Sequence, residues 1–239
     1  MSGAAMYATL RRLSVPVVTT EEAAAALRTS RSAASRGLRS LATKGLVRRI
    51  RHGLWAVTAE PLDPRAIVSE LTRPFPAYVS FRSALAARGA IDQVPREISV
   101  ASLAKPRRVE TALATYEIHR VPPELFGGFE DSGGVALATV EKAIFDYLYV
   151  ACASGHSDVR LPELDLPAAF SLNKLRRWVQ RIHAPRLRTR VATAVARALE
   201  HAEYEDARAP LGVARRANTR RMAGGARRTG ARRAVAGVG

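Results

Sequence analysis

The sequence contains a single cysteine, Cys152, among its 239 residues. One thiol cannot form an internal disulfide or a cysteine-based metal site, which excludes the disulfide-stapled folds and the zinc fingers. Long apolar runs are also missing, because charged residues interrupt the longest candidate, 140–153, well short of the roughly 20 residues of a spanning helix. Residues 1–13 lack the apolar core of a secretory signal. We therefore expect a soluble, cytoplasmic protein without a membrane partner.

Acidic residues are scarce at both ends of the chain. Residues 1–58 contain 10 basic and 2 acidic side chains, and residues 208–239 contain 9 basic and no acidic ones. The segment between them is balanced, so the net charge of +17 belongs to the two ends. Such an asymmetry indicates a polyanionic partner, most often nucleic acid. The preference for Arg over Lys fits a GC-rich coding bias and is weak evidence of function.

The pattern over residues 1–58 predicts three helices followed by a β-hairpin. Thr19 and Glu22 have the spacing of a capping box, which satisfies two free N–H groups at a helix start. Gly45 supplies the left-handed residue that commonly ends a helix. The expected elements are helices over 4–13, 19–27 and 30–43, the last capped by Thr29 or Ser30, a short strand at 17–18, and hairpin strands over 46–50 and 54–57.

The expected helix over 30–43 has two different faces. One face is apolar and would pack on the preceding helix, whereas the other carries hydroxyl and guanidinium groups. Arginine can contact guanine O6 and N7 with two hydrogen bonds, so this face suits DNA. Gly37 costs the helix about 1 kcal/mol relative to alanine, which a close helix–helix contact would explain. The apolar stripe is Ala34, Leu38 and Leu41, and the polar stripe is Ser32, Ser35, Arg36 and Arg39.

The hairpin after this helix is rich in arginine near its turn at Gly53. A helix-turn-helix followed by a cationic hairpin is the pattern of a winged helix, whose second helix enters the major groove. We expect Trp55 to pack in the core rather than stack on a base, with Leu54 beside it. A winged helix used for protein contacts is the alternative. The predicted DNA-binding residues are Thr29, Ser30, Arg31, Ser32, Ser35, Arg36, Arg39, Arg48, Arg49, Arg51 and His52.

Two prolines, Pro61 and Pro64, mark the expected boundary of a second domain with mixed α and β character. The fold class is therefore α+β: an N-terminal winged helix-turn-helix (1–58), an α/β domain with C-terminal helices (59–207) and a disordered Arg-rich tail (208–239). The tail either contacts phosphates or has no selected role. Expected elements are helices over 64–71, 80–88, 139–151, 168–183 and 185–204, and strands over 97–101, 116–121 and 135–138.

Signals for an enzyme are poor. The sequence has no phosphate-binding glycine loop, no histidine cluster of the zinc type and no nucleophile elbow. Asp92 and Glu97 precede a strand, as nuclease carboxylates do, but the lysine expected after Glu97 is absent. We predict no catalytic residue, no metal and no cofactor. Lys142 and Asp146 are four residues apart on an expected helix, which favours an ordinary surface ion pair.

Three stretches of the sequence resemble the AbiE-type antitoxins, the antitoxin half of type IV toxin–antitoxin pairs. The second and third stretches are more specific than the first, which is shared by many winged helices. Arg82 departs from the family pattern, where a bulky aromatic residue is expected, and the Arg-rich tail is a second departure. The stretches are Val18–Ala23 with Gly45–Trp55, Tyr78–Leu85 with Gln93–Val100, and Ala138–Asp146.

The resemblance implies an autorepressor that binds inverted repeats in double-stranded DNA upstream of its own operon. It also implies that the α/β domain counteracts a nucleotidyltransferase-like toxin, without requiring a stable complex. Two other hypotheses stay open: a winged-helix regulator whose C-terminal domain senses a ligand, and an enzyme that acts on nucleic acid. The residues that carry the family pattern in the α/β domain are Ser80, Ser83, Glu141, Lys142 and Asp146.

Overall fold

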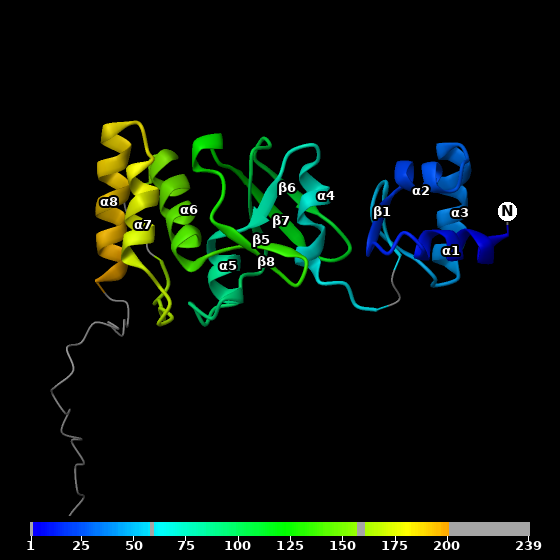
Figure 1. Ribbon diagram of the computed structural model, residues 1–239, viewed down its shortest axis with the longest axis horizontal. Coiled ribbons are helices and arrows are strands. Elements are labelled where there is room, and N and C mark those ends of the chain that lie inside the picture. The colour runs from blue at the N-terminus through cyan, green and yellow to red at the C-terminus, as the bar shows by residue number, and fades with distance from the viewer. Residues whose placement is uncertain (1, 58–59, 157–160, 201–239) are drawn as a thin grey trace, which may run out of the picture. The chain divides into compact units, whose positions relative to one another are not determined.

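The computed structural model describes residues 2–57, 60–156 and 161–200. Within these residues it contains eight α-helices and two β-sheets, a mixed α+β structure (Figure 1). The described residues belong to one compact unit. The remaining residues, and with them the predicted tail at 208–239, lie outside the part of the chain that the structure describes.

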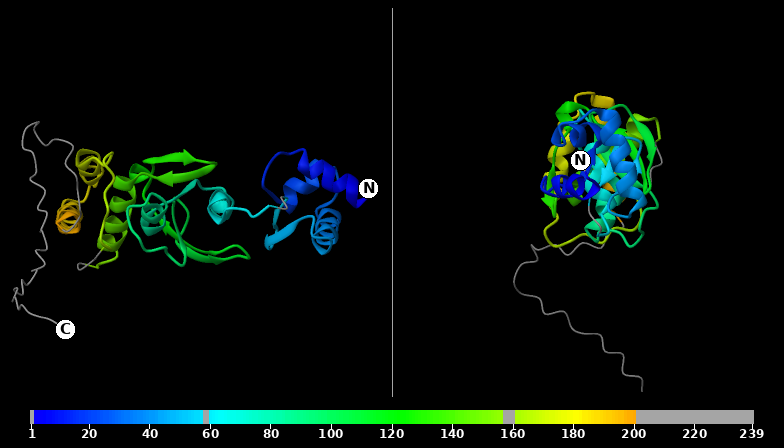
Figure 2. Two further views of the ribbon diagram at one scale, coloured as in Figure 1. Left: turned by 90° about the horizontal axis from the view of Figure 1, so that it is seen from below. Right: turned by 90° about the vertical axis from the view of Figure 1, so that its right-hand side faces the viewer.

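The N-terminal elements pack three helices on a small antiparallel sheet with the strand order β1-β3-β2. Thr19 and Glu22 form the predicted capping box of α2, and the hydroxyl of Ser30 caps α3 by accepting the N–H of Ala33. Figure 2 shows the first three helices, in blue, close to one another. The elements are α1 (Gly3–Arg11), β1 (Val17–Thr19), α2 (Thr20–Ala26), α3 (Arg31–Thr43), β2 (Arg48–Arg51) and β3 (Leu54–Ala56).

Gly37 lies on the α3 face that packs against α1. A Cβ at this position would be 2.4 Å from the Sδ atom of Met6, a buried residue of α1. The close helix–helix contact predicted for this glycine is therefore present. Trp55 is only 3% exposed, which confirms its predicted place in the core.

The second sheet has six strands in the order β6-β7-β5-β4-β9-β8. The pairs β5–β7 and β4–β9 are parallel and the others antiparallel. Three strands appear where predicted, but β4, β6 and β8 were missed, because they are short and the two edge strands β6 and β8 show no apolar alternation. The strands are β4 (Ala77–Val79), β5 (Ile98–Ser102), β6 (Arg107–Glu110), β7 (Thr115–Arg120), β8 (Phe129–Ser132) and β9 (Val135–Ala138).

Helices α6, α7 and α8 pack against one another beside this sheet (Figure 1). The predicted helix over 168–183 was too long at both ends, since the hydroxyl of Ser171 caps α7. The predicted helix over 64–71 begins as a 3-10 turn, Pro64–Ile67, before α4. The α-helices of this part are α4 (Val68–Thr72), α5 (Phe81–Ala87), α6 (Val140–Ala153), α7 (Leu172–Gln180) and α8 (Pro185–Leu199), and a 3-10 turn covers Pro123–Leu125.

Strand β3 is buried along its whole length, whereas only Ile50 is buried in β2. Leu54 and Trp55 are both buried, as predicted, but in different cores: Trp55 belongs to the core under α1–α3, whereas Leu54 and Ile50 belong to the larger core around the six-stranded sheet. The N–H of Ala112 donates to the carbonyl of Ile50 at 2.9 Å. The fold thus places one strand between two cores.

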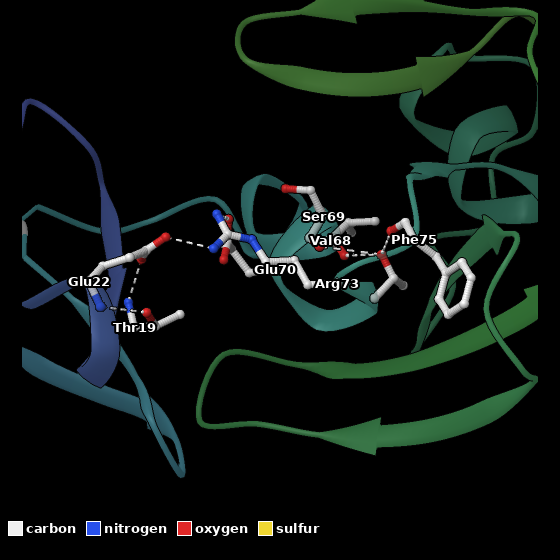
Figure 3. Close-up of polar contacts among 8 residues, drawn as sticks. Thr19, Glu22, Val68, Ser69, Glu70, Arg73 and Phe75 are labelled. Atoms are coloured by element: carbon white, nitrogen blue, oxygen red, sulfur yellow. Dashed lines mark hydrogen bonds and ion pairs between the residues drawn. The ribbon is translucent and has the colours of Figure 1, made fainter. Parts of the chain in front are cut away.

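Arg73 forms ion pairs with two carboxylates. Its guanidinium lies 2.6 Å from Glu22 of α2 and 2.7 Å from Glu70 of α4 (Figure 3). Glu22 also accepts the backbone N–H of Thr19 in the capping box. Burial raises the pKa of Glu22, but the hydrogen bonds from Thr19 and Arg73 outweigh it and leave that pKa below its ordinary value.

Candidate nucleic-acid interface

The exposed face of α3 and the tip of the β2–β3 hairpin enclose a hollow of about 800 Å³, here called the basic hollow. The apolar stripe of α3 is turned into the core, as predicted, so the opposite stripe is free to line this hollow. No acidic residue is part of the lining. The lining residues are Thr20, Arg31, Ser32, Ser35, Arg36, Arg39, Arg49, His52, Gly53 and Trp55.

Hydrogen bonds connect the residues at the floor of the basic hollow. The indole N–H of Trp55 donates to the hydroxyl oxygen of Thr20 at 3.0 Å, and the backbone N–H of Thr20 donates to the carbonyl of Gly53 at 2.9 Å. These bonds connect the start of α2 to the turn of the hairpin. Gly53 has a φ of +78°, a conformation that glycine adopts without a Cβ clash. The sequence pattern did not indicate Thr20, because its role depends on a partner 35 residues away.

Arginines around the hollow are held in different ways. The guanidinium of Arg39 donates to the backbone carbonyl and the hydroxyl of Ser35 on α3. The guanidinium of Arg49 lies 5.9 Å from the centre of the Trp55 ring. Arg31 forms an exposed ion pair of 3.1 Å with Glu21 of α2, so a carboxylate lies beside the first turn of α3.

Four of the predicted DNA-binding residues do not line the basic hollow. Ser30 uses its hydroxyl to cap α3, and Thr29 precedes that cap. Arg48 and Arg51 are exposed on β2, but they are absent from the lining that includes Arg49 between them. A β-bulge between Arg49 and Arg51 shifts the register with β3, which a reading of simple alternation could not foresee.

Three of the five residues that carry the resemblance beyond residue 60, Ser80, Lys142 and Asp146, lie in a buried polar cluster around Asp146. The hydroxyls of Ser80 and Tyr78 donate to its Oδ2 at 2.7 and 3.0 Å, and the ammonium of Lys142 donates to Oδ1. Lys142 and Asp146 are both 0% exposed, so the expected surface ion pair is wrong. Their i, i+4 spacing was read correctly, but α6 is buried on the face that carries them.

Lys142 is enclosed by aromatic rings. Its Nζ lies 4.4 Å from the ring centre of Trp178 and 4.9 Å from that of Phe145, and it donates to the carbonyl of Leu125 at 2.6 Å. Burial lowers the pKa of Lys142, an effect that the nearby Asp146 carboxylate opposes. Burial likewise raises the pKa of Asp146. No local pattern indicated Trp178 as a partner of Lys142, because α7 is separated from α6 by a long connection.

The two remaining pattern residues also hold backbone groups in place. The hydroxyl of Ser83 accepts the N–H of Ser99 at 2.9 Å and donates to the carbonyl of Glu97. Glu141, which is 4% exposed, accepts the N–H of Ser171 at 2.9 Å. All five residues are therefore bonded to other groups of the fold, and all but the half-buried Ser83 are buried.

Two classes of site can be assessed over the described ranges. In residues 2–57, 60–156 and 161–200, no group of three or more His, Cys, Asp or Glu side chains could hold a metal ion. The helices in the same ranges are too short or too polar to cross a membrane. The carboxylates Asp92 and Glu97 are not part of a metal-binding group there.

Comparison with known proteins adds no relative. The chain matches no family model, and no curated protein matches it either.

Proposed function

We propose that the protein is a DNA-binding transcriptional repressor that also acts as the antitoxin of a type IV toxin–antitoxin pair. The proposal that the protein binds DNA rests on the basic hollow. There α3 and the β2–β3 hairpin together present four arginines, with no carboxylate in the lining. DNA phosphates require such a surface, because neutralised charge and released counterions supply most of the affinity.

The arrangement supports a winged helix-turn-helix with α3 as its recognition helix. In this motif, the N-terminal residues of the recognition helix reach base edges. Arg31 and Arg36 would therefore contact bases, with Ser32 and Ser35 beside them. Arg49 and His52, on the hairpin, would contact the phosphate backbone. Trp55 has a supporting role, because its indole is buried beneath these groups.

The test is fluorescence anisotropy of the full chain with labelled DNA from upstream of its own gene and with a scrambled duplex. Arg36→Ala should cost about 1–3 kcal/mol on the upstream DNA and relax its sequence preference. Arg49→Ala should weaken both duplexes alike. Arg177→Ala, an exposed arginine of α7 outside the basic hollow, is the matched control. Equal losses for Arg36→Ala and Arg177→Ala would show that α3 does not read the DNA.

The antitoxin half rests on the resemblance in residues 78–100 and 138–146. The toxin-directed surface would lie outside the five pattern residues, since these bond to one another and to backbone groups inside the fold. The experiment is co-expression with the product of the adjacent gene, which should be nucleotidyltransferase-like. Growth should be rescued by the wild-type chain and by the double variant Arg36→Ala/Arg49→Ala, because DNA binding is a separate activity. Failure of the wild-type chain to rescue would refute the antitoxin assignment.

A ligand-sensing regulator is the second candidate, and one observation favours it: the large cavity beside the six-stranded sheet, described below. A sensor predicts that a small molecule changes DNA affinity, whereas an antitoxin predicts rescue from the neighbouring gene product. The two measurements are independent of each other.

A further inference from the structure

A cavity of about 1050 Å³ lies between the six-stranded sheet and α6. Its walls come from the start of α5, from β5 and β7, from the C-terminal half of α6 and from the loop before β5. This volume is at the upper end of the range for small-molecule sites, about 300–1000 Å³. The lining is Phe81, Arg82, Gln93, Val94, Pro95, Arg96, Glu97, Ser99, Glu117, His119, Tyr147, Val150, Ala151, Ser154 and His156.

One side of this cavity is aromatic and apolar. Phe81 is 3% exposed, and its ring centre lies 4.4 Å from that of His119. The φ of Phe81 is +54°, a left-handed conformation that costs a bulky residue free energy and holds the ring at the start of α5. Tyr147 and Val150 of α6 contribute further apolar surface. An apolar or aromatic ligand body would fit this side.

Of the charged side chains that line the cavity, some form an ion pair and others do not. Glu97 forms an ion pair of 2.7 Å with Arg108, so its charge is neutralised by a residue outside the lining. Within the described part of the chain, neither Arg82 nor Arg96 has a carboxylate in ion-pair contact. Glu117 is the remaining acidic group, and half of its side chain is exposed to solvent.

Arg82 carries the most specific signal. One Nη donates to the side-chain oxygen of Gln93 at 2.7 Å, but its Nε is buried and has no hydrogen-bond partner. A ligand in the cavity cannot reach this buried Nε, but the Nη atoms at the exposed end of the guanidinium are donors that suit a carboxylate or a phosphate.

We propose that this cavity binds a small organic anion, with its carboxylate or phosphate at Arg82 and Arg96 and its apolar body against Phe81 and Tyr147. The site lies outside the basic hollow and shares no lining residue with it. The inference deepens the ligand-sensing candidate, which rests on the same cavity, and it stands without the repressor and antitoxin assignments because no DNA takes part in the binding.

The experiment is isothermal titration calorimetry of the full chain with three probes that share an aromatic ring: phenyl phosphate, benzoate and uncharged phenol. We expect saturable 1:1 binding of phenyl phosphate or benzoate, with phenol at least about tenfold weaker, because only the anions can bridge the guanidinium groups. The preferred anion identifies the ligand as a phosphate or a carboxylate. The absence of binding by both anions, or binding of phenol as tightly as the better anion, would overturn the proposal.

Three variants with the same change of charge complete the test. Arg82→Gln and Arg96→Gln should each weaken the better anion by about tenfold, whereas Arg177→Gln, on the exposed side of α7, should leave it unchanged. Equal weakening in all three would indicate nonspecific attraction to a cationic protein and refute the site. Thermal melts establish that each variant is folded. If Arg82→Gln does not fold, the result for Arg96→Gln decides the test, because Arg96 is exposed and its replacement should not affect folding.

Discussion

The ion pair between Arg31 and Glu21 provides a gain-of-function test of the proposed DNA surface. If Arg31 contacts DNA, it must first leave Glu21, so the wild-type chain loses the energy of that pair on binding. The pair is 3.1 Å long, and its side chains are 66% and 71% exposed. Exposed pairs of this kind are worth about 0.2–1 kcal/mol, well below the Coulomb energy of a buried pair.

Glu21→Gln should therefore tighten DNA binding, by up to about fivefold, since 1.4 kcal/mol corresponds to a factor of ten. The assay is anisotropy with the upstream duplex over a series of salt concentrations. The gain should be largest at low salt, because exposed charges are screened over about 10 Å at 0.1 M. Glu124→Gln, in the 3-10 turn Pro123–Leu125, makes the same change of charge away from α3 and should have no effect.

The decisive comparison is made in a chain that lacks Arg31. If the gain depends on releasing Arg31, Glu21→Gln should have little effect in the Arg31→Ala background. A gain of the same size there would mean that Glu21 acts through general repulsion of phosphate. Unchanged or weaker binding by Glu21→Gln alone would refute the reasoning and remove Arg31 from the DNA surface.

Three further predictions concern stability and the tail. Lys142→Met should destabilise the chain by about 3–5 kcal/mol in urea denaturation, because it leaves a buried carboxylate unpaired, and Lys142→Met/Asp146→Leu should recover part of the loss. The pKa of Glu22 is lowered below its ordinary value of 4.5 in the folded state, so the stability it supplies is present above that value and lost as the pH falls through the lowered pKa. The melting-temperature difference between wild type and Glu22→Gln should accordingly shrink as the pH is lowered below 4.5, and a constant difference would contradict this linkage. If the tail contacts phosphates, deleting 208–239 should reduce the log–log salt slope by about 0.9 per lost contact, whereas an unchanged slope would assign the tail no part in DNA binding.

Local signals in the sequence were sufficient for most of the N-terminal elements. The capping box at Thr19 and the Ser30 cap appear at the expected helix starts, because each depends on groups within three residues. The 3.6-residue period likewise placed Leu38 and Leu41 in the core and left the polar stripe outside. Helix caps and apolar stripes depend only on the order of residues within one short segment, so the sequence of that segment is enough to predict them.

Features that join distant segments required the tertiary structure. Lys142 and Asp146 read as a surface pair because the sequence could not reveal that Trp178, from α7, and Tyr78, from β4, would enclose them. The edge strand β8 is exposed along its whole length and shows no alternation of buried and exposed residues.

The sequence by itself determined that the positive charge lies at the two ends of the chain and that α3 has a polar, cationic face. Only the tertiary structure decided that Arg49, and not Arg48 or Arg51, joins that face around one hollow, and that Arg82 lines a cavity instead of packing in the core. The physical reason is that a helix face follows from local periodicity, whereas a cavity depends on the register and packing of strands and helices that are far apart in the chain.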